Sequence, residues 1–180
     1  MDRKRQVTSR TALSRIPSRA DLLDKERGTY LKKWKGLLPV GLLYPNHYRV
    51  GMSNLGFQLV YRILNEWCTL VCERLFLPET DQQLVSLESG RPPADFSVIF
   101  ISVSFEHDYI NLARFFLASG LEPLASRRGE SIEPGNPLVV CGGVAAFMNP
   151  EPLADFVDLF VVGEAEPLLP LLIDKLSDDD

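Results

Sequence analysis

The sequence predicts an α/β fold built on one doubly wound, mainly parallel sheet of five strands. Short apolar runs alternate along the chain with segments whose apolar residues recur at helical spacing. One run, SVIFISV at residues 97–103, is almost continuously apolar, as expected for a strand covered on both faces. Five strands connected in this way most often take the order 2-1-3-4-5, which is the flavodoxin-like arrangement.

The five predicted strands are short, and proline marks several of their ends. Pro39 and Pro45 bound the first strand and Pro78 ends the second, because proline cannot donate to the hydrogen-bonded ladder. Residues 79–94 are polar and interrupted by proline, which indicates a loop with one short helix. In chain order, the strands are expected at residues 40–44, 70–77, 97–103, 138–141 and 159–162.

Three longer helices are expected between and after these strands. Residues 54–67 carry apolar side chains on one helical face, and Asn54 is suited to cap the first turn. Residues 108–119 form the second helix and end before Gly120, the residue type favoured just after a helix. Residues 164–176 form the third.

Charge divides the chain into two unlike parts. Residues 1–35 contain 11 of the 19 Lys and Arg residues and 4 of the 24 Asp and Glu residues, whereas residues 36–180 carry a net charge of −12. We expect residues 1–35 to be a basic, largely disordered N-terminal tail, since they show little apolar periodicity. A short helix at residues 19–26 that docks on the body is the alternative. Residues 36–177 then form the α/β domain, and residues 178–180 begin a linker.

Composition excludes several classes of protein. The chain is 46% hydrophobic and 24% charged, as in ordinary globular proteins. No apolar run has the length of a membrane span, and the N-terminus lacks the apolar segment of a secretory signal. The acidic body disfavours nucleic acid as a partner. Cys68, Cys72 and Cys141 are too few for a disulfide framework and predict a cytoplasmic location.

The segments that follow the strands hold the candidate site. In a doubly wound sheet, ligands bind outside the carboxyl ends of the strands. Small, polar or glycine residues follow four of the five predicted strands, and they let a backbone approach a ligand closely, although they also serve simply to turn a chain. We predict a binding edge there. The candidate residues are Asn46, His47, Ser53, Asn54, Gly56, Ser102, Ser104, Gly142, Gly143, Gly163 and Glu164.

Common nucleotide and metal motifs do not explain these segments. Gly51 and Gly56 lack the spacing of a G-x-G-x-x-G fingerprint, and no P-loop sequence is present. His47 and His107 are the two histidines of the chain, and both are predicted at this edge. An exposed loop histidine is nevertheless more common than a two-histidine metal site.

Two other features are interpreted as structural. Cys68 and Cys72 have the spacing that begins a radical SAM cluster motif, but Leu75 stands where the third thiolate would be, so we predict that both pack in the core. Glu164 and Glu166 precede or begin the last helix, where carboxylates favour the helix dipole.

Five stretches of the chain carry a resemblance to a known family. They are YPNHYRVGMSNLGFQLVYRILNE, VCERLFLPE, DFSVIFISVSFEHDYINLARFF, RRGE and PLVVCGGVAAFMNPEPLADFVDLFVVGEAE. Together they closely resemble the N-terminal region of a radical SAM protein family, over about residues 37–176. The resemblance implies a cobalamin-binding-like domain that precedes a barrel. In such a barrel a C-x-x-x-C-x-x-C motif binds a [4Fe–4S] cluster that cleaves S-adenosylmethionine.

The chain departs from that family pattern in informative ways. It has no C-x-x-x-C-x-x-C motif, so we expect an N-terminal domain of a longer enzyme without catalysis of its own. Base-off cobalamin domains carry D-x-H-x-x-G, but on alignment at His47 this chain has Pro45 for the Asp and Val50 for the Gly. The Asp that would orient the imidazole is therefore missing. The family's Gly-Gly is intact as Gly142 and Gly143.

Three hypotheses for the candidate edge follow from the resemblance. In the first, the domain holds cobalamin at the carboxyl ends of the strands and works with its own C-terminal barrel. In the second, it is a degenerate scaffold that binds no cofactor and presents this edge to the barrel or another partner. In the third, it is a flavin-binding, flavodoxin-like module.

Overall fold

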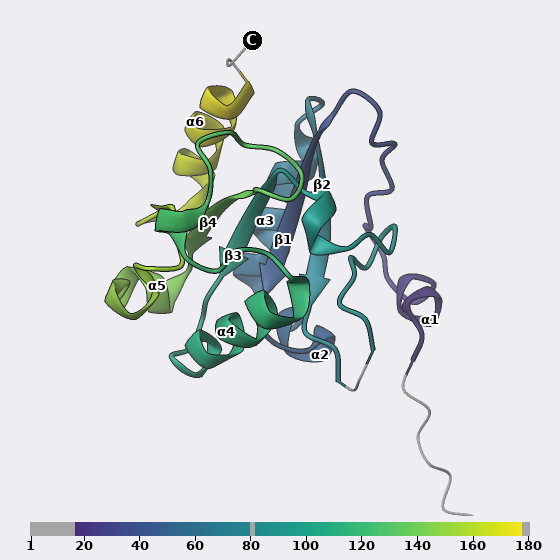
Figure 1. Cartoon of the computed structure of the whole chain (residues 1–180). Coiled ribbons are helices and arrows are strands. Elements are labelled where there is room, and N and C mark those ends of the chain that lie inside the picture. The colour runs from purple at the N-terminus through teal and green to yellow at the C-terminus, as the bar shows by residue number, and fades with distance from the viewer. Residues whose placement is uncertain (1–16, 80–81, 178–180) are drawn as a thin grey trace, which may run out of the picture.

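Five strands form a single sheet in the order β2-β1-β3-β4-β5, and every neighbouring pair is parallel (Figure 1). The structure is a computed structural model, and it describes residues 17–79 and 82–177. The strands are β1 (Leu38–Tyr44), β2 (Leu70–Phe76), β3 (Val98–Ser102), β4 (Leu138–Gly142) and β5 (Leu159–Phe160). The predicted fold class and strand order are confirmed.

Three of the helices are long and match the predicted ones closely. They are α3 (Leu55–Glu66), α4 (His107–Ser119) and α6 (Ala165–Ser177). Of the other helices, α1 (Arg19–Leu23) lies within the short docking helix at residues 19–26 that was the alternative to a tail. The remaining ones are too short for hydrophobic periodicity to reveal: α2 (Tyr48–Gly51) and α5 (Val144–Met148), with 3-10 turns at Pro93–Asp95, Ala125–Arg127 and Glu151–Leu153. Within the described residues, no helix is long and apolar enough to cross a membrane.

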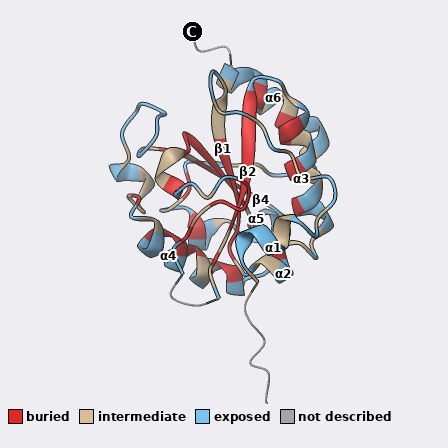
Figure 2. Ribbon diagram, turned by 90° about the vertical axis from the view of Figure 1, so that its right-hand side faces the viewer, coloured by how far each residue is buried: buried red, intermediate tan, exposed pale blue. Residues whose placement is uncertain are grey.

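Each face of the sheet has its own hydrophobic core. Along β1, Leu42 points into the core beneath α3 and α6, whereas its neighbour Leu43 points into the core beneath α4. This alternation follows from the two-residue period of a strand. Figure 2 shows the result, with buried residues on the strands and on the inner sides of the helices. The sheet is therefore covered on both faces, as the apolar β3 predicted.

Local signals placed several element ends correctly. The Asn54 side chain accepts a hydrogen bond from the Phe57 N–H at 2.8 Å, so Asn54 caps α3 as predicted. Gly120 ends α4 with φ at +70°, in the left-handed region that glycine favours. The last strand is shorter than predicted. After β5, Val161 still donates to the Cys141 carbonyl, but the chain then turns at Gly163, where φ is +137°.

The N-terminal segment differs from the expected tail. Residues 17–35 lie along the β2 edge of the domain (Figure 1), whereas residues 1–16 and the predicted linker at 178–180 lie outside the described residues. Tyr30 packs edge-on against Tyr61 of α3, and Trp34 packs against Phe96. The Trp34 indole also donates to Glu73 at 2.6 Å. Two partly buried aromatic side chains therefore pack this basic segment against the body.

A buried cluster of charged groups joins this segment to β2. The Arg74 side chain is 2% exposed and lies between two carboxylates, with Nη2 at 2.6 Å from Glu26 and Nε at 2.6 Å from Glu88. Burial alone raises the pKa of Glu26, but hydrogen bonds from Arg74, Tyr48 and Thr29 lower it below its ordinary value. Burial raises the pKa of Glu88 despite Arg74. Position 26, expected in the tail, is thus part of the folded domain.

Candidate functional site

A cavity of about 700 Å³ lies at the carboxyl ends of β1, β3 and β4, between α3 and α6. Its floor is formed by Leu42, Phe100 and Val140, which are paired in register on these three neighbouring strands. Leu59 and Val60 of α3 line one side. The volume is within the range of about 300–1,000 Å³ that is typical of small-molecule sites, which are also mostly apolar.

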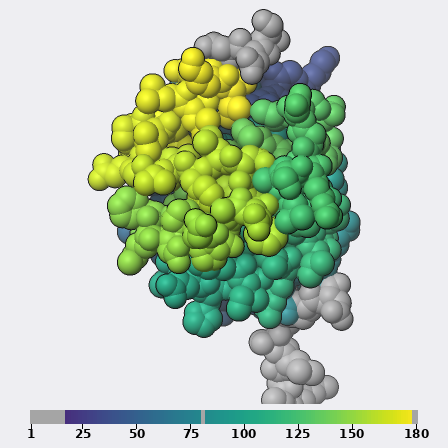
Figure 3. Space-filling model, turned by 60° about the vertical axis from the view of Figure 1, so that its left-hand side comes forward, coloured from purple at the N-terminus to yellow at the C-terminus, as the bar shows by residue number. Residues whose placement is uncertain are grey.

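The mouth of the cavity carries exposed apolar side chains. Leu55 at the start of α3 is 80% exposed, and Phe147 of α5 is 61% exposed. Val144 is also exposed and lines the cavity. In Figure 3, α6 and the segment from α5 to β5 lie next to each other on one face of the molecule. Apolar groups exposed around a cavity are typical of a surface that binds a ligand or another protein.

Eight of the predicted site residues line this cavity. The segments after β1, β3, β4 and β5 all contribute to it, as the rule for ligands at the carboxyl ends of parallel strands predicted. The eight are Asn54, Gly56, Ser102, Ser104, Gly142, Gly143, Gly163 and Glu164.

Three predicted residues, Asn46, His47 and Ser53, lie away from the cavity wall. The exposed His47 ring is hydrogen-bonded through Nδ1 to the Leu77 carbonyl at 3.1 Å. Ser53 is exposed and donates to the Val50 carbonyl at 2.7 Å. The Asn46 side chain accepts a hydrogen bond from the His47 N–H, so it organises the loop after β1.

A hydrogen-bond network ties the loops after β1 and β3 together. The Asn54 amide donates to Ser104 Oγ at 2.9 Å, across the edge where strand order reverses. Asp108 of α4 is 1% exposed and accepts from the N–H groups of Ser104 and Phe105 at 3.3 and 3.1 Å. Its other oxygen is 3.4 Å from the Asn46 amide nitrogen. Asp108 was not among the predicted site residues, although its position at the start of a predicted helix was the available signal.

The glycine pair after β4 has a structural role. Gly143 has φ at +107°, and a Cβ there would collide with the backbone of Val103. A Cβ on Gly142 would make only an ordinary contact, at 3.4 Å from the Val161 carbonyl oxygen. The turn from β4 into α5 therefore requires glycine at position 143 because the chain crosses closely over the end of β3.

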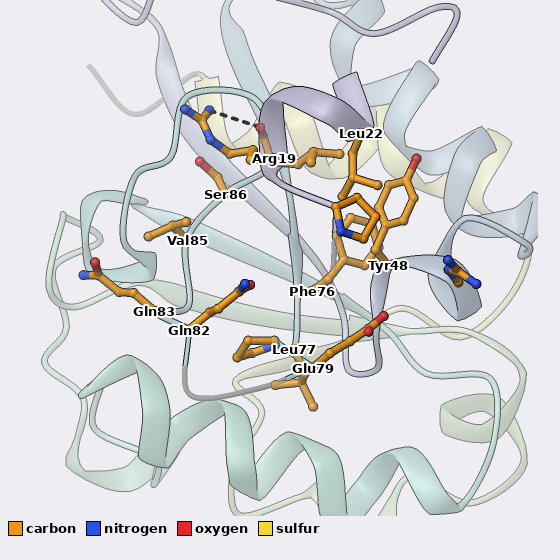
Figure 4. Close-up of a pocket in the computed structure, with 14 residues that line it drawn as sticks. Arg19, Leu22, Tyr48, Phe76, Leu77, Glu79, Gln82, Gln83, Val85 and Ser86 are labelled. Carbon is orange, nitrogen blue, oxygen red and sulfur yellow. Dashed lines mark hydrogen bonds between the residues drawn. The ribbon is translucent and has the colours of Figure 1, made fainter. Parts of the chain in front are cut away.

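A second, smaller hollow of about 140 Å³ lies beside α1 (Figure 4). Arg19, Leu22 and Tyr48 contribute to its wall. The Arg19 guanidinium donates to the Leu87 carbonyl at 3.2 Å and so joins α1 to the segment after β2. The hollow is smaller than a typical cofactor site, so we interpret it as the seam between the N-terminal segment and the domain.

The three cysteines differ in their exposure to solvent. Cys72 is buried in β2 as predicted, whereas Cys68 is exposed rather than packed in the core. Burial raises the pKa of the Cys72 thiol well above its ordinary value. In the described part of the chain, no three His, Cys, Asp or Glu residues are grouped so that they could hold a metal ion.

Residues 56–179 match a protein family described as radical SAM proteins, N-terminal. The chain belongs to this family. The resemblance noted in the sequence is thereby confirmed for the family, and the match covers β2, β3, β4 and β5 together with α4 and α6.

A relative from Methanocaldococcus jannaschii carries no assigned function. This uncharacterised protein is 27% identical over 129 residues, which are 71% of this chain and 24% of the relative. The chain therefore spans about a quarter of the length of the relative that it matches.

Proposed function

We propose that this chain is an accessory domain of a radical SAM enzyme and that it holds a cobalamin at the carboxyl ends of its strands. One observation carries the proposal: the cavity of about 700 Å³ at the ends of β1, β3 and β4. Part of the cofactor would enter this cavity, and the remainder would lie against the exposed apolar groups of the mouth. The cofactor would supply the chemistry, and the protein would position it and exclude water.

The residues at the cavity fit such a cofactor without a histidine ligand from this domain. His47 does not line the cavity, and its Nδ1 is engaged with the Leu77 carbonyl. Ser102 and Ser104 are polar residues among those that line the cavity. Polar side chains are a minority among the lining residues, which is typical of small-molecule pockets.

For the parent protein, we propose a C-terminal barrel that holds the [4Fe–4S] cluster and S-adenosylmethionine. Membership of the radical SAM N-terminal family supports this assignment. The exposed apolar groups at the mouth, Leu55, Val144 and Phe147, would then face the barrel. The same groups support the second candidate function, a scaffold that binds no cofactor and uses this edge only for docking.

Titration of the purified domain with hydroxocobalamin separates the two functions. We expect a change in the visible spectrum and a rise in the melting temperature. Leu59→Trp fills the cavity and should abolish both effects, whereas Leu117→Trp, on the exposed face of α4, should retain them. His47→Ala should bind as the wild type does. Without a spectral change or stabilisation at saturating cobalamin, the cofactor proposal fails and the scaffold remains.

A further inference from the structure

The N–H groups that could bind an anion after β3 already have an anionic partner inside the protein. The N–H groups of Ser104 and Phe105 both donate to one carboxylate oxygen of Asp108, at 3.3 and 3.1 Å. Consecutive backbone N–H groups in such a loop form the concave anion site of many α/β proteins. Here the buried carboxylate occupies that position, so a phosphate group of a ligand would have to displace it.

Two helix termini beside the cavity, those of α3 and α6, also have an oxygen acceptor or a carboxylate of the chain beside them. At the start of α3, the Phe57 N–H donates to the Asn54 oxygen at 2.8 Å. The first turn of α6 contains Glu166, whose negative charge compensates the positive end of that helix. At each of these two termini, an oxygen of the chain therefore competes with an anionic ligand.

The charged groups on the cavity wall have one sign. Among the described residues that line the cavity, Glu164 and Glu166 are charged, and no Lys, Arg or His is present. Both glutamates are exposed at the mouth. Residues 36–180 also carry a net charge of −12, so the wider field around the mouth is negative as well.

From these three observations we infer that the cavity selects its ligand by charge. It takes a neutral or positively charged group and excludes an anionic one such as a phosphate monoester. Glu164 and Glu166 determine this specificity, and Asp108 and Asn54 occupy the N–H groups of Ser104, Phe105 and Phe57, which an anion would otherwise use. The inference rests on the proposed function, because it concerns the ligand of the same cavity. It also separates cobalamin, whose single phosphodiester charge is balanced by its cobalt–corrin centre, from flavin mononucleotide, whose phosphate monoester is dianionic and would find no positive partner among the lining residues.

Three probes test the selection in the wild-type chain. Aquocobalamin, formed from hydroxocobalamin at slightly acidic pH, is a cation, whereas cyanocobalamin has the same corrin and is neutral. Flavin mononucleotide is the anionic probe. At low salt we expect aquocobalamin to bind about fivefold more tightly than cyanocobalamin, because two carboxylates at the mouth attract the cation through a largely aqueous medium. High salt should reduce this ratio. Flavin mononucleotide should not raise the melting temperature.

Paired variants assign the effect to the cavity. Glu164→Gln with Glu166→Gln should bring the ratio of the two cobalamin affinities close to one. Glu66→Gln with Glu130→Gln removes the same charge from exposed positions that do not line the cavity, and it should leave the ratio unchanged.

The possible results distinguish this inference from the proposed function. Equal affinities for the two cobalamins in the wild type overturn the inference alone. So does a ratio that persists in the Glu164/Glu166 double variant, or stabilisation by flavin mononucleotide equal to that by cobalamin. If neither cobalamin binds the wild type, the proposed function fails, and the inference fails with it.

Discussion

Replacement of Glu26 by Gln should destabilise the domain far more than the same replacement at an exposed glutamate. Four donors converge on the Glu26 carboxylate: both terminal nitrogens of Arg74, at 2.6 and 3.1 Å, the Tyr48 hydroxyl at 2.6 Å and the Thr29 hydroxyl at 2.8 Å. The Glu26 side chain is 9% exposed and that of Arg74 is 2% exposed. This position is therefore a buried, charge-assisted site.

The size of this destabilisation follows from the number of hydrogen-bond acceptors that each side chain offers. Gln has the shape of Glu but offers one oxygen, so two of the four donors would face an amide nitrogen. The change removes charge-assisted hydrogen bonds and leaves buried donors unsatisfied, which together should lower the free energy of unfolding by about 3 kcal/mol. For an m-value of about 2 kcal/mol/M in urea, the unfolding midpoint should fall by about 1.5 M.

Urea unfolding followed by tryptophan fluorescence measures this effect. Glu66→Gln is the matched control, because Glu66 pairs with Arg62 at 3.6 Å while both side chains are about 60% exposed, and such pairs contribute about 0.5 kcal/mol or less. A loss for Glu26→Gln as small as that of the control would refute the reasoning. It would mean that the N-terminal segment contributes nothing to the fold through Arg74.

The destabilisation caused by Glu26→Gln should depend on pH. The pKa of Glu26 lies below its ordinary value of 4.5 in the folded domain. The stability that Glu26 contributes is therefore fully present above pH 4.5 and is lost as the pH falls through the lower folded pKa. The difference between wild type and Glu26→Gln should shrink in that acidic range. A difference that stays constant there would contradict the assigned role of the carboxylate.

Three further predictions concern the loops and thiols. Asp108→Ala should lower the free energy of unfolding by about 2–3 kcal/mol in urea, because it removes the acceptor of two backbone N–H groups. Gly143→Ala should destabilise by more than about 2 kcal/mol, whereas Gly120→Ala, also at positive φ but with free space around it, should lose only about 1 kcal/mol. In a thiol-reactivity assay Cys68 should react first, since it is exposed while Cys72 and Cys141 are buried; burial raises the pKa of Cys141 to about 12. Equal native-state rates for the three thiols would contradict the last prediction.

Local patterns were sufficient for the architecture. Three signals that each span only a few residues were placed correctly: the apolar run around β3, the cap at Asn54 and the glycine after α4. Strand order followed from the regular alternation of elements, because parallel strands joined by helices have few arrangements. The same rule brought the loops after four strands to one edge, where eight predicted residues line the cavity.

Contacts between segments far apart in the sequence could not be predicted from such local patterns. Composition assigned residues 17–35 to a tail, because a few aromatic groups and one Glu do not form a periodic signal. In the structure Tyr30 and Trp34 reach Tyr61 and Phe96, more than 30 positions away. Asp108 was missed as well: it accepts from Ser104 and Phe105, four and three positions before it, but its contact with Asn46 in the loop after β1, 62 positions away, is not a local pattern.

The sequence by itself determined the strands and the three long helices, the faces that they bury and the edge of the sheet that carries polar loops. Only the tertiary structure decided which side chains of that edge reach the cavity. His47 and Asn54 both follow β1, yet the Leu77 carbonyl holds the histidine away, and Ser104 holds the asparagine at the cavity wall. The physical reason is that periodicity and capping act over a few residues, whereas a side chain's direction at a loop is set by partners that only the folded chain brings near.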